Sequence, residues 1–291
     1  MPVEHRAVRE TIPVPRQDFP VIIRKTLVNR PQMIFGGHFH PQFELLYIKR
    51  GKLSLCCNKT DLQLEAGQLA VLNPYDIHTA YSEKGLLYYY CVILDPNFLG
   101  GGSGDVCSTR YIQPFAHGDL HFSNVTTATA PCKELFERLV NEYTTGTPGF
   151  ELAIKADLLQ IFLELYRTVP FSKLNAAERQ IRQREGKRFQ VLFQYLDNHY
   201  NQNITLDQMA EIANYSMYYF SRLFHRLTGK KPMEYLRNLR LQKSMELLLS
   251  GMSVSETAMH CGFNSPNYFS KIFREEFGQA PSAFLVPPRD R

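Results

Sequence analysis

Two stretches near the end of the chain offer side chains that could bind nucleic acid. Each stretch follows a serine, Ser216 or Ser265, and reads as a helix with one apolar and one polar face. The polar faces carry Tyr218, Ser221, Arg222 and His225 in the first stretch and Asn267, Ser270, Lys271 and Arg274 in the second. Small polar, amide and basic groups of this kind hydrogen-bond base edges and phosphates in a DNA major groove. Both stretches are therefore candidate DNA-reading helices.

The simpler alternative is that both helices are ordinary amphipathic helices with solvated polar faces. The sequence does not favour this alternative, because the pattern of residues that contains each helix occurs twice. Residues 205 to 232 return as residues 253 to 281, offset by 48 residues at the front and 49 at the back. Such self-similarity indicates one supersecondary unit built twice.

Each copy reads as a helix, a tight turn and a second helix. Thr205 and Ser253 are suited to N-capping the first helices. Residues 214 to 216 and 262 to 264 are short enough to fold the second helix sharply across the first, which is the geometry of a helix-turn-helix.

One long helix, from Pro232 to near Gly251, should join the two units. Its buried side would consist of Leu236, Leu239, Leu247 and Leu248. A helix of this length can hold the units at a fixed separation. If that separation is about 34 Å, both reading helices can enter successive major grooves on one face of the duplex.

Residues 188 to 285 resemble the DNA-binding domain of the AraC/XylS family of bacterial transcription regulators. The resemblance is carried by residues 258 to 263, 268 to 273 and 278 to 281. It implies tandem helix-turn-helix units, double-stranded promoter DNA as a partner and activation through RNA polymerase. By position, it assigns base contacts to Tyr218, Ser221 and Arg222 in the first unit and to Asn267, Ser270 and Lys271 in the second.

The charge distribution agrees with a nucleic-acid partner, and the cysteine usage agrees with a cytoplasmic protein. Residues 1 to 170 carry 16 basic and 17 acidic side chains, whereas residues 171 to 291 carry 17 and 11. The basic excess therefore lies in the back half, as DNA binding requires. The six cysteines show no C-x-x-C spacing and read as reduced thiols. The apolar stretches are too short to span a membrane.

The front half reads as closely spaced strands between Val21 and Leu94, which predicts a small antiparallel barrel or sandwich. Within it, His38, His40 and Glu44 would share one side of a regular strand, and His78 could return to them from a later hairpin. The pattern resembles the first cupin motif. In cupin enzymes, three histidines and a glutamate bind a divalent metal.

Sensor domains of the AraC/XylS family have a similar pattern, in which the barrel more commonly holds a small effector. We therefore interpret His38, His40, Glu44 and His78 as an effector pocket, expect no cofactor and keep a bound metal as the alternative. Aromatic residues crowd the region, and Tyr47 and Tyr90 are the candidates to line the pocket around a polar ligand such as a sugar.

Two helices should follow the barrel, over residues 132 to 143 and 150 to 168. They resemble the family's dimerisation element, with Leu159, Phe162 and Tyr166 as candidate contacts. The competing interpretation is that both apolar stripes pack on the barrel. The polar residues 171 to 187 read as a linker.

The sequence thus predicts an α+β multidomain chain. It comprises a cupin-like antiparallel β-barrel (1–128), a helical pair for homodimerisation (129–170), a linker (171–187) and an all-α double helix-turn-helix domain (188–291). We expect a cytoplasmic, effector-responsive transcription activator without enzymatic activity. The alternative is a metal-binding cupin enzyme or metal sensor with an appended DNA-binding domain.

Overall fold

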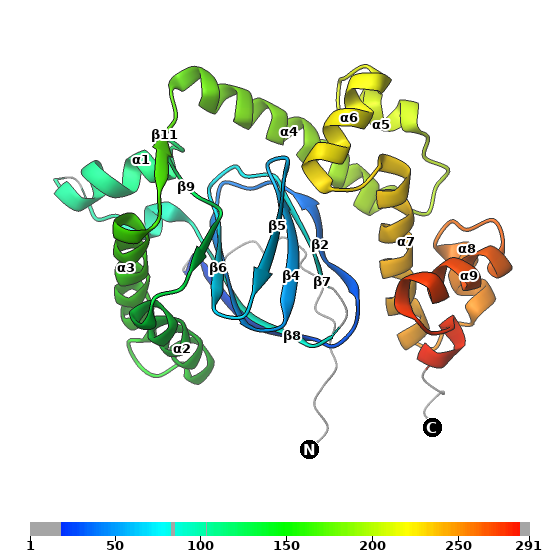
Figure 1. The fold of residues 1–291 in the computed structure, drawn as a ribbon, viewed down its shortest axis with the longest axis horizontal. Helices are drawn as coiled ribbons and strands as arrows, with labels where there is room; N and C mark the ends of the chain where they lie inside the picture. Colours follow the sequence, from blue (N-terminus) through cyan, green and yellow to red (C-terminus); the bar gives the residue numbers. More distant parts are fainter. Residues whose placement is uncertain (1–18, 83–84, 103, 286–291) are drawn as a thin grey trace.

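A computed structural model describes residues 19–82, 85–102 and 104–285. An antiparallel β domain occupies the front half of the chain, and a run of helices occupies the back half (Figure 1). The α+β architecture expected from the sequence is confirmed. Within the described part of the chain, every helix is too short or too polar to cross a membrane.

Two antiparallel sheets face each other in the β domain. The first runs in the order β1 (Val21–Val28), β8 (Leu87–Leu94), β3 (Phe43–Arg50), β6 (Gln68–Leu72) and β10 (Val125–Thr127). The second runs in the order β2 (Gln32–His38), β7 (His78–Ser82), β4 (Lys52–Cys57) and β5 (Thr60–Glu65). A separate two-stranded ribbon pairs β11 (Phe171–Lys173) with β9 (Leu120–Phe122).

Strand β3 shows how the two sheets divide the core, because successive side chains of a strand point to opposite faces. Leu46 and Ile48 lie in the apolar cluster between the sheets. Phe43, Leu45 and Tyr47 lie in a second cluster, on the outer face of the first sheet. Glu44 has the same parity as Leu46, so its carboxylate points into the barrel.

Helices α2 (Ala130–Thr145) and α3 (Phe150–Thr168) cover that outer face, and short helical turns precede them at Pro96–Leu99, Ser108–Ile112 and α1 (Gln113–Ala116). The buried stripe of α2 consists of Leu135, Phe136, Leu139 and Val140. Phe162 of α3 is only 5% exposed and packs in the same cluster. Its expected role as a dimer contact is therefore wrong, because its ring packs against Phe115 of α1 and Phe122 of β9.

The segment expected as a linker is regular structure. After β11, helix α4 (Ala176–His199) begins at Asn175 and runs without a break into the carboxy-terminal half. A capping box fixes its start: the Asn175 side chain accepts from the Glu178 amide, and the Glu178 carboxylate accepts from the Asn175 amide. The two halves of the molecule are thus joined by a helix.

Two helix-turn-helix units follow, as the repeat predicts. They consist of α5 (Leu206–Ile212) and α6 (Met217–Thr228), then α8 (Val254–His260) and α9 (Pro266–Phe277), with α7 (Pro232–Leu249) between them and a short turn at Pro281–Phe284 after them. Thr205 and Ser253 both form capping boxes, at α5 and α8. Gly262, with φ of 76°, makes the turn of the second unit.

The outer face of the second sheet is covered by the carboxy-terminal half. Helix α4 and helix α7 contact β2, and α6 contacts β4 and β7. Three barrel residues, Met33, Phe39 and Ile77, belong to the same apolar cluster as the first helix-turn-helix unit. Figure 1 shows α8 and α9 farther out, carried on α7. The first unit is thus seated on the barrel.

Candidate functional site

The first candidate site is the exposed face of α6. Its apolar face is buried through Phe220, Leu223, Phe224 and Leu227. The expected contact residues lie on the other side: Tyr218 is 74% exposed, Arg222 and His225 are exposed, and Ser221 is partly buried. The Arg222 guanidinium lies 5.7 Å from the centre of the Tyr218 ring, so the two side chains form one surface.

The equivalent face of α9 has the same character. Asn267, Lys271 and Arg274 are exposed, and Ser270 is partly buried. Ser265 caps the helix by accepting from the backbone amide of Tyr268. Both faces combine hydrogen-bonding groups with a basic side chain at the middle of the helix, Arg222 or Lys271, and such groups can contact bases and phosphates in a major groove.

Exposed residues that were not predicted from the sequence lie next to both faces. Met217 is 48% exposed, Tyr219 is 43% exposed, and Tyr268 is 51% exposed. The sequence signal that could have found them was their position in the first turn, one or three residues after Ser216 and three residues after Ser265. Large exposed side chains there are candidates for contact with bases or sugars. These assignments, like those of the faces themselves, stay predictions.

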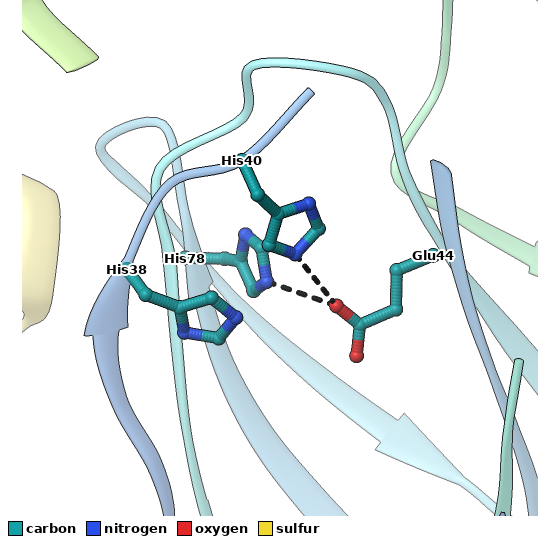
Figure 2. Close-up of side chains that lie close together, drawn as sticks. All are labelled: His38, His40, Glu44 and His78. Carbon is teal, nitrogen blue, oxygen red and sulfur yellow. Dashed lines mark hydrogen bonds and ion pairs between the residues drawn. The ribbon is translucent and has the colours of Figure 1, made fainter. Parts of the chain in front are cut away.

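The second candidate site lies inside the barrel, where His38, His40, Glu44 and His78 converge (Figure 2). One ligand atom from each residue can be chosen so that all four lie within 4.8 Å of one another. His40, Glu44 and His78 are 5%, 0% and 1% exposed. The expected grouping of the four residues therefore occurs in the structure, although its function stays a prediction.

The elements that build this cluster differ from the expected single regular strand. His38 ends β2, His40 lies in the connection after it, and Glu44 is the second residue of β3 in the other sheet. His78 begins β7, beside His38 in the register of the second sheet. The cluster therefore draws on both sheets, because the chain leaves the second sheet after His38 and enters the first at Phe43.

Backbone carbonyls fix the orientation of all three imidazoles. The Nδ1 atom of His38 bonds the Gly36 carbonyl at 2.8 Å, that of His40 bonds the Gln42 carbonyl at 3.1 Å, and that of His78 bonds the Asp76 carbonyl at 2.9 Å. Because a carbonyl oxygen only accepts, each Nδ1 carries the proton. Each Nε2 is then the atom left to bind something else.

The Glu44 carboxylate faces two of these Nε2 atoms. Its Oε2 lies 3.2 Å from Nε2 of His40 and 3.2 Å from Nε2 of His78 (Figure 2). Burial acts to raise the pKa of Glu44, but the hydrogen bonds with both histidines outweigh it and hold that pKa well below its usual range. The cluster is thus built around a buried negative charge.

His38 and His78 respond differently to the same surroundings. Burial lowers the pKa of His38 well below its usual value, and the neighbouring His78 and His40 lower it further. Burial also opposes the charged form of His78, but its bond to Glu44 raises its pKa overall. The surroundings of His38 therefore favour its neutral form.

The two tyrosines expected in the pocket lie elsewhere. Tyr47 stacks on Phe136 of α2 with ring centres 5.3 Å apart, and the Tyr90 hydroxyl donates to Glu137 of α2 at 2.7 Å. Both belong to the cluster on the outer face of the first sheet. Their expected place beside the histidines is wrong. Tyr47 points to the opposite face of β3 from Glu44, and Tyr90 of β8 is paired with Tyr47, so it points to that same face.

A buried carboxylate that was not predicted from the sequence lies next to the cluster. Asp76, 1% exposed, accepts from His121 Nε2 and Asn124 Nδ2 at 2.9 Å each and from Arg182 Nη1 at 3.2 Å. Because Arg182 belongs to α4, this carboxylate ties the barrel to the helix that leads to the carboxy-terminal half. The sequence signal that could have found Asp76 was its position two residues before His78, a candidate ligand.

Comparison with known proteins adds the family context. Residues 26–162 match the AraC-like ligand binding domain family, and residues 209–286 match a helix-turn-helix domain family. The chain is 35% identical over 255 residues to the HTH-type transcriptional activator RhaS of Escherichia coli O157:H7, covering 86% of this chain and 87% of that protein.

Other relatives are more distant. The uncharacterized HTH-type transcriptional regulator YbfI of Bacillus subtilis is 24% identical over 236 residues, which cover 80% of this chain and 81% of YbfI. Among solved structures, ToxT from Vibrio cholerae with a bound unsaturated fatty acid aligns with 94% of this chain and 98% of its own, at 14% identity and a TM-score of 0.43.

Proposed function

The chain belongs to the AraC/XylS family of transcription regulators, and we propose that α6 and α9 read two adjacent subsites of promoter DNA. It is a DNA-binding regulator with an effector-binding front domain. The observation that carries the proposal is the pair of matched amphipathic helices whose outward faces hold Arg222 and Lys271. The effector class, including a sugar, stays a prediction.

The proposal includes a homodimer formed through α3. The outer face of this helix carries Leu152, Ala156, Leu159 and Leu163, all exposed and spaced by four, three and four residues. The three leucines are 76%, 37% and 43% exposed. Apolar residues at this spacing form the seam of paired helices. A second copy of α3 would cover them.

Activation is the expected direction of regulation. The relative RhaS is named a transcriptional activator, and its alignment extends over most of both chains. We therefore propose that the chain acts in the cytoplasm and contacts RNA polymerase at its promoter. We propose no enzymatic role, since the named relatives are transcription regulators.

The proposal is tested by selecting duplexes from a random-sequence DNA library with the full-length protein. The expected result is a motif of two half-sites about one helical turn apart, each protected in the major groove. Failure to enrich any sequence, from protein shown to be folded by circular dichroism, would overturn the proposed function.

A further inference from the structure

We propose that His38, His40, His78 and Glu44 bind one divalent first-row transition-metal ion, and that this ion is the effector. The inference rests on the proposed function in one respect, namely that the front domain controls DNA binding. Imidazole nitrogen and carboxylate oxygen suit zinc, manganese and iron in proteins. The four residues offer three nitrogens and one oxygen from a buried place.

The distances between the candidate ligand atoms fit coordination of one shared metal ion. With metal–ligand bonds of about 2.1 Å, neighbouring ligand atoms in tetrahedral or octahedral coordination lie about 3.0–3.4 Å apart. The two distances from Glu44 Oε2, to His40 Nε2 and to His78 Nε2, are both 3.2 Å. The full set spans no more than 4.8 Å, so a small contraction would bring every ligand to bonding distance.

The hydrogen bonds around the cluster are those of a metal site. Metal-binding histidines commonly donate their other ring N–H to a carbonyl or carboxylate, which fixes the tautomer and ring direction. Here His38, His40 and His78 all do so through Nδ1, each with a backbone carbonyl two residues away. Nε2 of His40 and Nε2 of His78 then both face the Glu44 carboxylate, and a cation, either a proton or a metal ion, must lie between each nitrogen and the oxygen.

The competing explanation is a purely structural cluster in which the cation is a proton. In that case, a proton on Nε2 of His78 would bond Glu44 and the cluster would fill the barrel without a ligand. The two explanations differ in one measurable respect: a structural cluster binds no metal at a stoichiometry of one per chain.

The ligands are adjacent in the chain to residues that seat the first helix-turn-helix unit. Phe39 lies between His38 and His40, is 3% exposed and packs in the cluster that holds this unit. Its ring fills the space at Gly186 of α4 so closely that a Cβ there would lie 1.9 Å from a ring carbon. Ile77, which precedes His78, belongs to the same cluster.

A second contact lies one residue before His38. The Gly37 amide donates to the Tyr235 hydroxyl of α7 at 2.7 Å, and a Cβ on Gly37 would lie 2.4 Å from the Phe193 ring of α4. An ion that fixes His38, His40 and His78 would therefore fix the surface on which α4 and α7 rest. Because a ligand shifts an equilibrium only by its differential affinity, the ion favours the seated arrangement.

The first test measures metal binding by full-length protein after chelation and gel filtration. We expect one Zn²⁺ or Mn²⁺ per chain by mass spectrometry of metal content and by calorimetry. Glu44→Gln and His78→Gln should weaken binding at least about 100-fold, since loss of an outer-shell partner alone costs 10–100-fold. His117→Gln, at an exposed histidine of the same domain, is the matched control.

Two outcomes would overturn the metal proposal. One is folded wild-type protein that binds no stoichiometric metal, and the other is equal metal binding by wild-type and Glu44→Gln protein. Glu44→Gln nearly preserves side-chain shape, so it guards against a result caused by unfolding, which circular dichroism checks. Neither outcome affects the proposed function, which fails only if no DNA sequence is selected.

The second test asks whether the barrel transmits metal binding to the DNA-binding unit. Hydrogen exchange of amides in α4 and α6 should slow by about tenfold on adding Zn²⁺, within the range of ordinary allosteric coupling. Phe39→Leu should keep metal binding and lose most of this protection. Phe136→Leu, at a buried phenylalanine of α2 that packs on the outer face of the first sheet, should keep both. Equal protection in wild-type and Phe39→Leu protein would overturn the coupling.

Discussion

The ring of Phe39 occupies the position where a side chain at Gly186 would begin, so the barrel and α4 meet without space between them. This contact joins a residue flanked by two candidate metal ligands to the helix that leads into the DNA-binding half. It also explains a glycine inside a helix, where glycine is otherwise unfavourable by about 1 kcal/mol relative to alanine.

Gly186→Ala should therefore destabilise the protein despite the better helix propensity of alanine. The added methyl group clashes with the Phe39 ring, and overpacking of this kind costs about 1–3 kcal/mol. The free energy of unfolding from urea titration measures it. In the double variant Gly186→Ala/Phe39→Ala the clash is absent, so the two changes should cost less together than the sum of their separate effects. Additive effects would contradict the contact.

Loss of a basic side chain from either reading helix should weaken DNA binding. Arg222→Ala and Lys271→Ala should each cost about 1–3 kcal/mol of binding free energy to the selected duplex. Both side chains are exposed, so the free energy of unfolding should change by no more than about 0.5 kcal/mol. Lys133→Ala, at an exposed lysine of α2, is the control. Fluorescence anisotropy that shows unchanged affinity in both variants would count against the assignment of α6 and α9.

The outer face of α3 should control the oligomeric state. Leu159→Lys places a charge in the centre of the exposed apolar stripe and should convert the dimer to a monomer. Gln160→Lys adds the same charge beside the stripe, at another exposed position of α3, and should leave the dimer intact. Light scattering after gel filtration distinguishes the two. A wild-type monomer, or a dimer in Leu159→Lys protein, would exclude this interface.

Removing the buried charge of Asp76 should destabilise the junction between the barrel and α4. Asp76→Asn replaces an acceptor oxygen by an NH₂ group among donors from His121, Asn124 and Arg182. Breaking a buried ion pair costs about 3–5 kcal/mol. Urea denaturation measures this loss, and Asp61→Asn, at an exposed aspartate of the same domain, should change stability little. An equal midpoint for wild-type and Asp76→Asn protein would contradict this role.

The carboxy-terminal half could be predicted from sequence because its signals are local. Capping residues, helical periodicity and the internal repeat gave both helix-turn-helix units and α7 nearly to their ends. The four-residue cluster in the barrel was also found, since its histidines and glutamate stand out among apolar strands. The four side chains come together in the structure, although His38, His40 and Glu44 do not lie on one regular strand as expected.

The errors come from non-local packing and from strand parity. Tyr47 and Tyr90 face α2 because their positions in β3 and β8 are of the parity that points outward. Phe162 was expected at a dimer surface, but Phe115 and Phe122 cover it. Residues 171 to 187 read as a linker because they are polar, yet the capping pair Asn175 and Glu178 was a visible signal for the helix that begins at Ala176. The seating of Phe39 on Gly186 has no local signature.

The most direct test of the account is the affinity of full-length protein for its selected duplex, measured with Zn²⁺ and with a chelator. When the first helix-turn-helix unit is held on the barrel, α6 and α9 can adopt fewer relative arrangements. Such preorganisation favours DNA binding. Wild-type protein should therefore bind about tenfold more tightly with Zn²⁺. Glu44→Gln protein should match the metal-free wild-type affinity under both conditions. An unchanged or lowered affinity of zinc-loaded wild-type protein would contradict the account.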